Sequence, residues 1–287
     1  MKAIRDFLEL IKFEHTIFAL PFAYLGMLVA AGGFPSLHQF FWITVAMAAA
    51  RTLAMGFNRI ADRVVDARNP RTAIRPLVTG SISLRTAWVG TLTAAVILVL
   101  AAWQLGPLPL RLLPGAVLFL VGYSFTKRFT WLSHFILGFT DGLAPAGAWA
   151  AIRGSLFTAA DLPAWLLTAV VTFWIGGFDL IYACQDVEHD RRDALYSIPA
   201  RFGIPFALAL STLSHVLTIL LLGCLGLLLD FGWPFWLGFI VVIGLLTWEH
   251  RLVNPKDLTK INLAFFNINS YISLTLFIAV LGAIYLP

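Results

Sequence analysis

The chain has 287 residues, of which 60% are apolar and only 12% are charged, and its mean hydropathy is +0.85. Soluble globular domains are about half apolar and about a quarter charged, so this composition excludes an ordinary soluble protein and indicates a membrane protein. The net charge of +5 does not require a nucleic-acid partner, because a basic cytoplasmic rim on an apolar helix bundle accounts for its sign.

The N-terminal segment spreads charged side chains over its first turns instead of presenting an uninterrupted apolar stretch. Lys2, Arg5, Asp6, Glu9 and Lys12 alternate with apolar residues. This pattern predicts an amphipathic helix at the membrane surface and not a cleaved signal peptide.

Long apolar runs occupy most of the remaining chain, and each is close to the roughly 20 residues that cross a bilayer. We expect spans near residues 14–33, 38–60, 84–104, 108–125, 131–152, 162–185, 204–229, 232–248 and 263–286. The expected fold is therefore all-α: a polytopic membrane protein of nine transmembrane helices around a central cavity open to the cytoplasmic side. We expect a single domain, 1–287, with two weakly similar halves of about 1–130 and 131–287.

The distribution of basic residues predicts the orientation of the protein in the membrane. If the N-terminus is cytoplasmic, all of the 20 Lys and Arg residues except Arg111 and Arg153 fall on or next to the cytoplasmic side. This distribution satisfies the positive-inside rule. We expect a multi-pass protein of the bacterial inner membrane, with the N-terminus and the functional site in the cytoplasm.

Two polar segments interrupt the apolar chain, and each sets oxygen-bearing side chains four residues apart. The first contains Asn58, Asp62 and Asp66, and the second contains Asp186 and Asp190. Side chains spaced by four lie on one face of a helix. Two facing rows of carboxylates repel each other unless a cation lies between them, and oxygen-only ligands suit Mg²⁺ shared with a substrate phosphate.

Three segments resemble a known family. NRIADRVVDARNPRTAIRPLVTG (58–80) is similar to the NxxxDxxxD signature of the UbiA superfamily of intramembrane aromatic prenyltransferases, and DLIYACQDVEHD (179–190) is similar to its DxxYxxxDxxxD signature. YSFTKRFT (123–130) resembles the short basic loop between spans four and five of that family. The resemblance covers nearly the whole chain and is nearest to the 4-hydroxybenzoate polyprenyltransferase branch.

The resemblance implies a Mg²⁺-dependent enzyme that transfers a polyprenyl group from polyprenyl diphosphate to a small aromatic acceptor. It implies that Asp62, Asp66, Asp186 and Asp190 are catalytic and that these acids, with Asn58, hold the metal. Metal ions and cationic side chains would stabilise the pyrophosphate leaving group. The implied substrate-binding residues are Asn58, Arg75, Tyr123, Lys127, Arg128, Asp179 and Tyr182.

Each assignment has a simpler alternative. The acids could cap helices or lie in solvent, and Arg75, Lys127 and Arg128 could serve only as topology signals. Tyr182 could be an interfacial aromatic residue. Arg51, which shares a helical face with Asn58, could bind phosphate or extend toward the interface.

The acceptor is the least determined part. We expect 4-hydroxybenzoate for quinone biosynthesis, but Glu14 and His15 stand where that branch has a basic residue and a PxG-like turn. This departure leaves a futalosine-type acceptor for menaquinone as the alternative. Asp141 lies within the fifth expected span, where an ionisable side chain usually faces a cavity, and we expect it to line the acceptor pocket.

Another functional class is a membrane transporter with an acidic ion site. A CDP-alcohol phosphotransferase is disfavoured because the DxxDGxxAR signature is absent. Cys184 and Cys224 are expected to be packing residues, and Asn267 and Asn269 are expected to form hydrogen bonds within the bundle.

Overall fold

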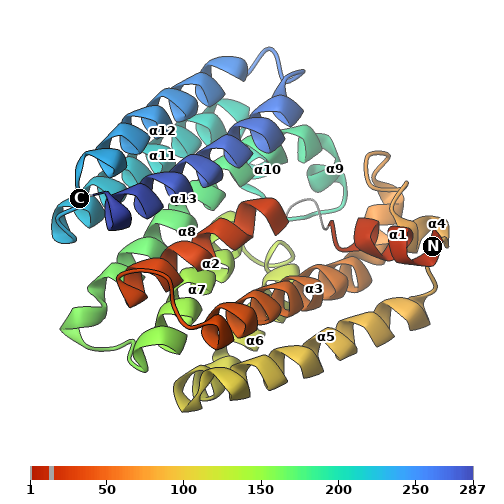
Figure 1. Ribbon diagram of the computed structural model, residues 1–287. Coiled ribbons are helices and arrows are strands. Elements are labelled where there is room, and N and C mark those ends of the chain that lie inside the picture. The colour runs from red at the N-terminus through yellow and green to blue at the C-terminus, as the bar shows by residue number, and fades with distance from the viewer. Residues whose placement is uncertain (1, 13–15, 287) are drawn as a thin grey trace.

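The computed structural model describes residues 2–12 and 16–286, and these residues form a helical bundle without β-strands (Figure 1). The α-helices are α1 Lys2–Leu10, α2 Thr16–Ala31, α3 Leu37–Arg68, α4 Pro76–Thr79, α5 Leu84–Leu105, α6 Pro107–Thr126, α7 Ser133–Arg153, α8 Leu162–Ala183, α9 Val187–Arg192, α10 Ile198–Phe202, α11 Ile204–Leu228, α12 Trp233–Leu252 and α13 Asn269–Tyr285. Shorter turns are the 3₁₀ segments η2 Ala159–Asp161 and η3 Cys184–Asp186 and the π-helical segment η4 Leu263–Ile268. The all-α prediction is confirmed.

Eight helical segments in the described part of the chain are long and apolar enough to cross a membrane, which makes the protein an integral, multi-pass membrane protein. The remaining expected span, near residues 14–33, corresponds to α2, whose 16 residues rise only about 24 Å at 1.5 Å per residue, short of the roughly 30 Å hydrocarbon core. The count of nine spans and the side on which the cavity opens therefore stay predictions.

The bundle is built around α2, α7 and α8 (Figure 1). Helices α3, α5 and α6 pack together on one side of this centre, and α11, α12 and α13 pack on the other. Close approach depends on glycine: a Cβ on Gly26 of α2 would lie 2.3 Å from the carbonyl oxygen of Pro145 in α7. Small residues at such crossings let membrane helices approach backbone to backbone.

The short helices α1, α4, α9 and α10 lie toward one end of the bundle (Figure 1). Helix α1 buries Leu10 and exposes Arg5 and Glu9, as an amphipathic helix would, but it also buries Asp6 and exposes Leu8. It packs against α3 and α4, at the end of α3 that carries the first acidic segment.

Some sequence-based expectations need correction. Cys184 is buried as expected, but Cys224 is exposed and is not a packing residue. The second acidic segment is not one continuous helix, because α8 ends at Ala183 and a 3₁₀ turn separates it from α9. Glu14 and His15 lie outside the described residues.

Candidate functional site

The first acidic segment forms one row along α3. Asp62 and Asp66 are 2% and 5% exposed, and the amide nitrogen of Asn58 donates a hydrogen bond of 3.2 Å to Oδ2 of Asp62. Arg59 fixes the other end of this amide, since its Nη1 donates to Oδ1 of Asn58 at 3.2 Å and its Nε donates to the carbonyl of Leu10 at 3.3 Å. The sequence did not indicate Arg59 as a site residue, although Arg59 orients the side chain of Asn58.

Asp62 is bound by two cations from the connection between α6 and α7. Nζ of Lys127 lies 2.5 Å from Oδ2 of Asp62, and Nη2 of Arg128 lies 3.3 Å from Oδ1. Arg128 also donates to the carbonyl of Ala61 at 2.7 Å, which fixes it against α3. Lys127 and Arg128, which the sequence suggested as diphosphate-binding residues, are thus both paired with Asp62 in the structure.

Asp66 is bound by Arg75, which precedes α4. Nη1 of Arg75 lies 2.6 Å from each carboxylate oxygen of Asp66. The hydroxyl of Thr72 donates to the backbone carbonyl of Asp66 at 2.9 Å, so the loop folds back over the end of α3. This turn brings an arginine nine residues farther along the chain onto the acid.

The second acidic segment is connected to the same loop through Asp186. Arg71 binds Asp186 with two nitrogens, Nη2 at 2.5 Å from Oδ2 and Nε at 3.0 Å from Oδ1, while Asn69 donates to Oδ1 at 2.9 Å. Nη1 of Arg71 also donates to the hydroxyl of Tyr182 at 2.8 Å. Burial works against the charge of Arg71, but the hydrogen bonds and charge of Asp186 outweigh it and raise the pKa of Arg71.

Asp190 completes the cluster from α9. It accepts a hydrogen bond from Ser197 and lies near enough to Lys127 and Asp186 to interact with their charges. Nη2 of Arg192 donates to the carbonyl of Arg68 at 2.8 Å, so the ends of α3 and α9 are in direct contact. The two acidic segments therefore meet at one end of the bundle, as the sequence predicted.

Two predicted substrate-binding residues have partners elsewhere. Oδ2 of Asp179 lies 2.7 Å from Nδ1 of His134, whose Nε2 accepts a hydrogen bond from the backbone of Ile198 at 3.3 Å. The hydroxyl of Tyr123 donates to the carbonyl of Ala54 at 3.3 Å. His134 carries no signal in the sequence that would assign it to this site.

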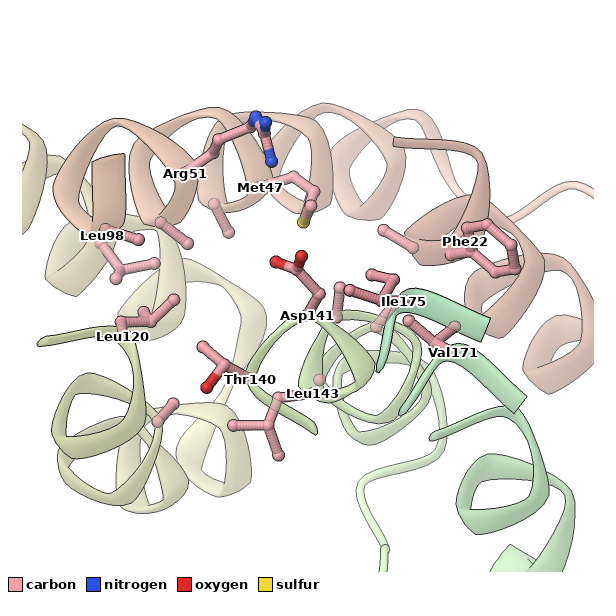
Figure 2. Close-up of a pocket in the computed structure, with 18 of the residues that line it drawn as sticks. Phe22, Met47, Arg51, Leu98, Leu120, Thr140, Asp141, Leu143, Val171 and Ile175 are labelled. Carbon is pink, nitrogen blue, oxygen red and sulfur yellow. The ribbon is translucent and has the colours of Figure 1, made fainter. Parts of the chain in front are cut away.

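A cavity of about 290 Å³ lies between α2, α3, α5, α6, α7 and α8, and Tyr123 and Asp179 are among the residues that line it. Most of its lining is apolar. Figure 2 shows Asp141 of α7 pointing into this space, with Arg51 on the opposite wall in α3. None of the hydrogen bonds or ion pairs found among the described residues involves Asp141, and Nε of Arg51 is buried without a partner among those residues.

The donor set consists of carboxylate and amide oxygens, which fits a hard divalent cation. Within residues 2–12 and 16–286, no three acidic, histidine or cysteine side chains are grouped closely enough to hold an ion. Instead, Asp62, Asp66 and Asp186 are each bound by lysine or arginine. These are the cations that a bound diphosphate would also require, with arginine as a forked donor and lysine as a point charge.

Comparisons with known proteins agree with this arrangement. Residues 19–271 match the model of the UbiA prenyltransferase family. The 4-hydroxybenzoate octaprenyltransferases of Pseudoalteromonas translucida and Pseudomonas aeruginosa UCBPP-PA14 are 32% and 31% identical to this chain; the matches cover 90% and 88% of it and 86% and 84% of those proteins.

Solved structures show the same fold. The apo structure of a UbiA homolog from Aeropyrum pernix K1 has a TM-score of 0.84 and 32% identity, over 92% of this chain and 95% of that one. A UbiA homolog from Archaeoglobus fulgidus bound to GPP and Mg²⁺ has a TM-score of 0.67 over 94% of this chain and 99% of that one, and at 19% identity it supports the fold alone. The chain, which brings two acidic helix ends together beside an apolar cavity, belongs to the UbiA prenyltransferase family.

Proposed function

We propose that this protein transfers a polyprenyl group from polyprenyl diphosphate to an aromatic acceptor, with Mg²⁺ as cofactor and 4-hydroxybenzoate as the favoured acceptor, in quinone biosynthesis. The observation that carries the proposal is the contact between the two acidic segments through Asn69, Arg71 and Asp186, beside an apolar cavity. A dense set of cations and acids next to an apolar space suits a substrate with a charged head and a long hydrocarbon chain.

In this proposal the oxygens of Asn58, Asp62, Asp66, Asp186 and Asp190 would hold Mg²⁺, which would neutralise charge on the diphosphate. Lys127, Arg128, Arg75 and Arg71 would then turn from their carboxylate partners to diphosphate oxygens. The allylic C–O bond breaks as pyrophosphate leaves, a bond forms from the allylic carbon to the ring, and the ring loses a proton. Cations positioned before the reaction stabilise the leaving group most effectively.

The cavity is the proposed place for the apolar parts of the substrates. Asp141 is the lining carboxylate without a hydrogen-bond partner among the described residues, so it can accept a hydrogen bond from the hydroxyl of an aromatic acceptor. Arg51 on the opposite wall could bind an acidic substituent of the same ring. A ring with both groups, such as 4-hydroxybenzoate, would satisfy both side chains.

The relatives support the choice of acceptor and donor. The bacterial relatives described above are 4-hydroxybenzoate octaprenyltransferases, and the Archaeoglobus structure contains GPP and Mg²⁺. We propose the same substrate classes for this chain, a location in the bacterial inner membrane, and a site that faces the cytoplasm. The basic residues around the acidic segments favour that orientation.

The proposal is tested by incubating the purified protein in detergent with Mg²⁺, geranyl diphosphate and a panel of aromatic acceptors, followed by mass spectrometry. The panel includes 4-hydroxybenzoate and a futalosine-type compound. We expect a prenylated product that disappears when the metal is chelated and returns when Mg²⁺ is added in excess. Absence of any prenylated product, together with an ion-transport activity that survives Asp62→Ala, would contradict prenyl transfer.

A further inference from the structure

A second buried polar group lies away from the acidic cluster, where α12 meets α13. Glu249 is 0% exposed and Asn269 is 1% exposed, and the amide nitrogen of Asn269 lies 3.1 Å from Oε1 of Glu249. Polar groups are expensive to bury within a membrane bundle, and they are usually retained for a function. Hydrophobic residues would pack this position at lower cost, so the pair calls for an explanation.

Asn269 directly follows η4, the π-helical segment of the last membrane helix. Its amide nitrogen lies 3.2 Å from the carbonyl oxygen of Ala264 and 3.1 Å from that of Phe265, in addition to its contact with Glu249. Single π-helical turns within α-helices occur frequently at functional sites. The side chain of Asn269 therefore stabilises the π-helical turn by hydrogen bonds to two of its carbonyl groups, and the contact with Glu249 positions Asn269.

The π-helical turn contains Phe265, which lines the cavity. The centroid of the Phe265 ring lies 4.2 Å from that of Tyr182 and 5.2 Å from that of Phe178. Tyr182 in turn accepts the 2.8 Å hydrogen bond from Arg71, the residue that binds Asp186 with two nitrogens. A continuous series of contacts thus runs from Glu249 to the acidic cluster.

We propose that Glu249 and Asn269 are positioning residues, which hold the π-helical turn so that Phe265 supports Tyr182 and keeps Arg71 and Asp186 in place for the diphosphate. This inference rests on the proposed function, because it assigns the supported residues to donor binding. Neither Glu249 nor Asn269 is assigned a contact with substrate. Both act through the ring of Phe265.

The test measures the dissociation constant of geranyl diphosphate, with Mg²⁺ present, for the purified full-length protein. Asn269→Leu and Glu249→Leu should each weaken binding about tenfold, within the range observed for residues that act through a contact network. Glu249→Gln keeps an oxygen for Asn269 and should restore binding to within about twofold of wild type. The control is Thr218→Val, at a residue of α11 that is 2% exposed and bonds only within its own helix.

A double variant separates positioning from general destabilisation. If Asn269 acts through Phe265, Asn269→Leu should add less than about twofold in a Phe265→Ala background, because coupled residues are not additive. A full tenfold effect in that background, or wild-type affinity in Asn269→Leu, would overturn the inference alone. A wild-type protein that does not bind geranyl diphosphate at all would overturn the proposed function and this inference with it.

Discussion

Asn69 and Asp186 are 117 residues apart in the chain, yet Nδ2 of Asn69 lies 2.9 Å from Oδ1 of Asp186. This contact joins the loop after the first acidic segment to the second acidic segment. Arg71 strengthens the connection with two further hydrogen bonds to the same carboxylate. The two segments therefore form one polar cluster, and a change at Asp186 affects both of them.

Replacing Asp186 with Ala should reduce prenyl transfer by at least about 100-fold, the scale observed when one charge-stabilising group is removed from an active site. The variant loses a proposed metal ligand and leaves Arg71 without its carboxylate partner. Product formation by mass spectrometry measures the effect. Asp257→Ala is the matched control, because Asp257 is a partly exposed acid whose hydrogen bonds are confined to its own loop. Activity within tenfold of wild type in Asp186→Ala would contradict the assignment.

Arg71→Lys should keep the positive charge but lose the forked geometry, since an ammonium group cannot reproduce the hydrogen bonds to both Asp186 and Tyr182. We expect the KM for geranyl diphosphate to rise about tenfold, which corresponds to the loss of one charged hydrogen bond. Steady-state kinetics with varied donor and saturating acceptor measure this change. An unchanged donor KM would show that Arg71 serves only to hold Asp186.

The sequence could predict most of the helices and the acidic residues. Apolar runs of about 20 residues identify the long membrane helices. Spacing by four places Asp62 and Asp66 on one face of α3. The motifs also indicated Lys127 and Arg128, which the structure places on Asp62. These features are local, so they can be inferred from neighbouring residues alone.

The long-range partners could not be predicted from local spacing. Arg68, Arg71 and Arg75 look equivalent in one basic loop, and only the tertiary fold directs Arg71 to Asp186 and Arg75 to Asp66. The pairing of His134 with Asp179 joins α7 to α8, and the sequence of neither segment indicates this pairing. Sequence spacing also did not indicate the break after Ala183 or the π-helical turn at Leu263–Ile268, where Asn269 donates to the carbonyls of Ala264 and Phe265.

Asp141→Asn should raise the KM for the aromatic acceptor about tenfold and leave the affinity for geranyl diphosphate unchanged. The carboxylate of Asp141 faces the cavity, and hydrogen bonds to a charged group contribute more than those to a neutral amide. Separate titrations of the acceptor and the donor measure the two effects, so donor binding serves as an internal control. Equal loss of both affinities would indicate a disturbed cavity and not a specific contact with the acceptor.

Gly138→Ala should destabilise the bundle at the crossing of α7 and α8. A Cβ at residue 138 would lie 2.2 Å from the carbonyl oxygen of Thr172, so the two helices would have to separate. Overpacking of this kind typically costs about 1–3 kcal/mol. A lower midpoint of thermal unfolding in detergent measures the loss.

Gly147→Ala, in the same helix, is the control. It adds a Cβ with no atom within 4 Å and should unfold at or slightly above the wild-type temperature, because alanine favours helix over glycine. Equal midpoints for the two variants would show that α7 and α8 can accommodate the extra methyl group.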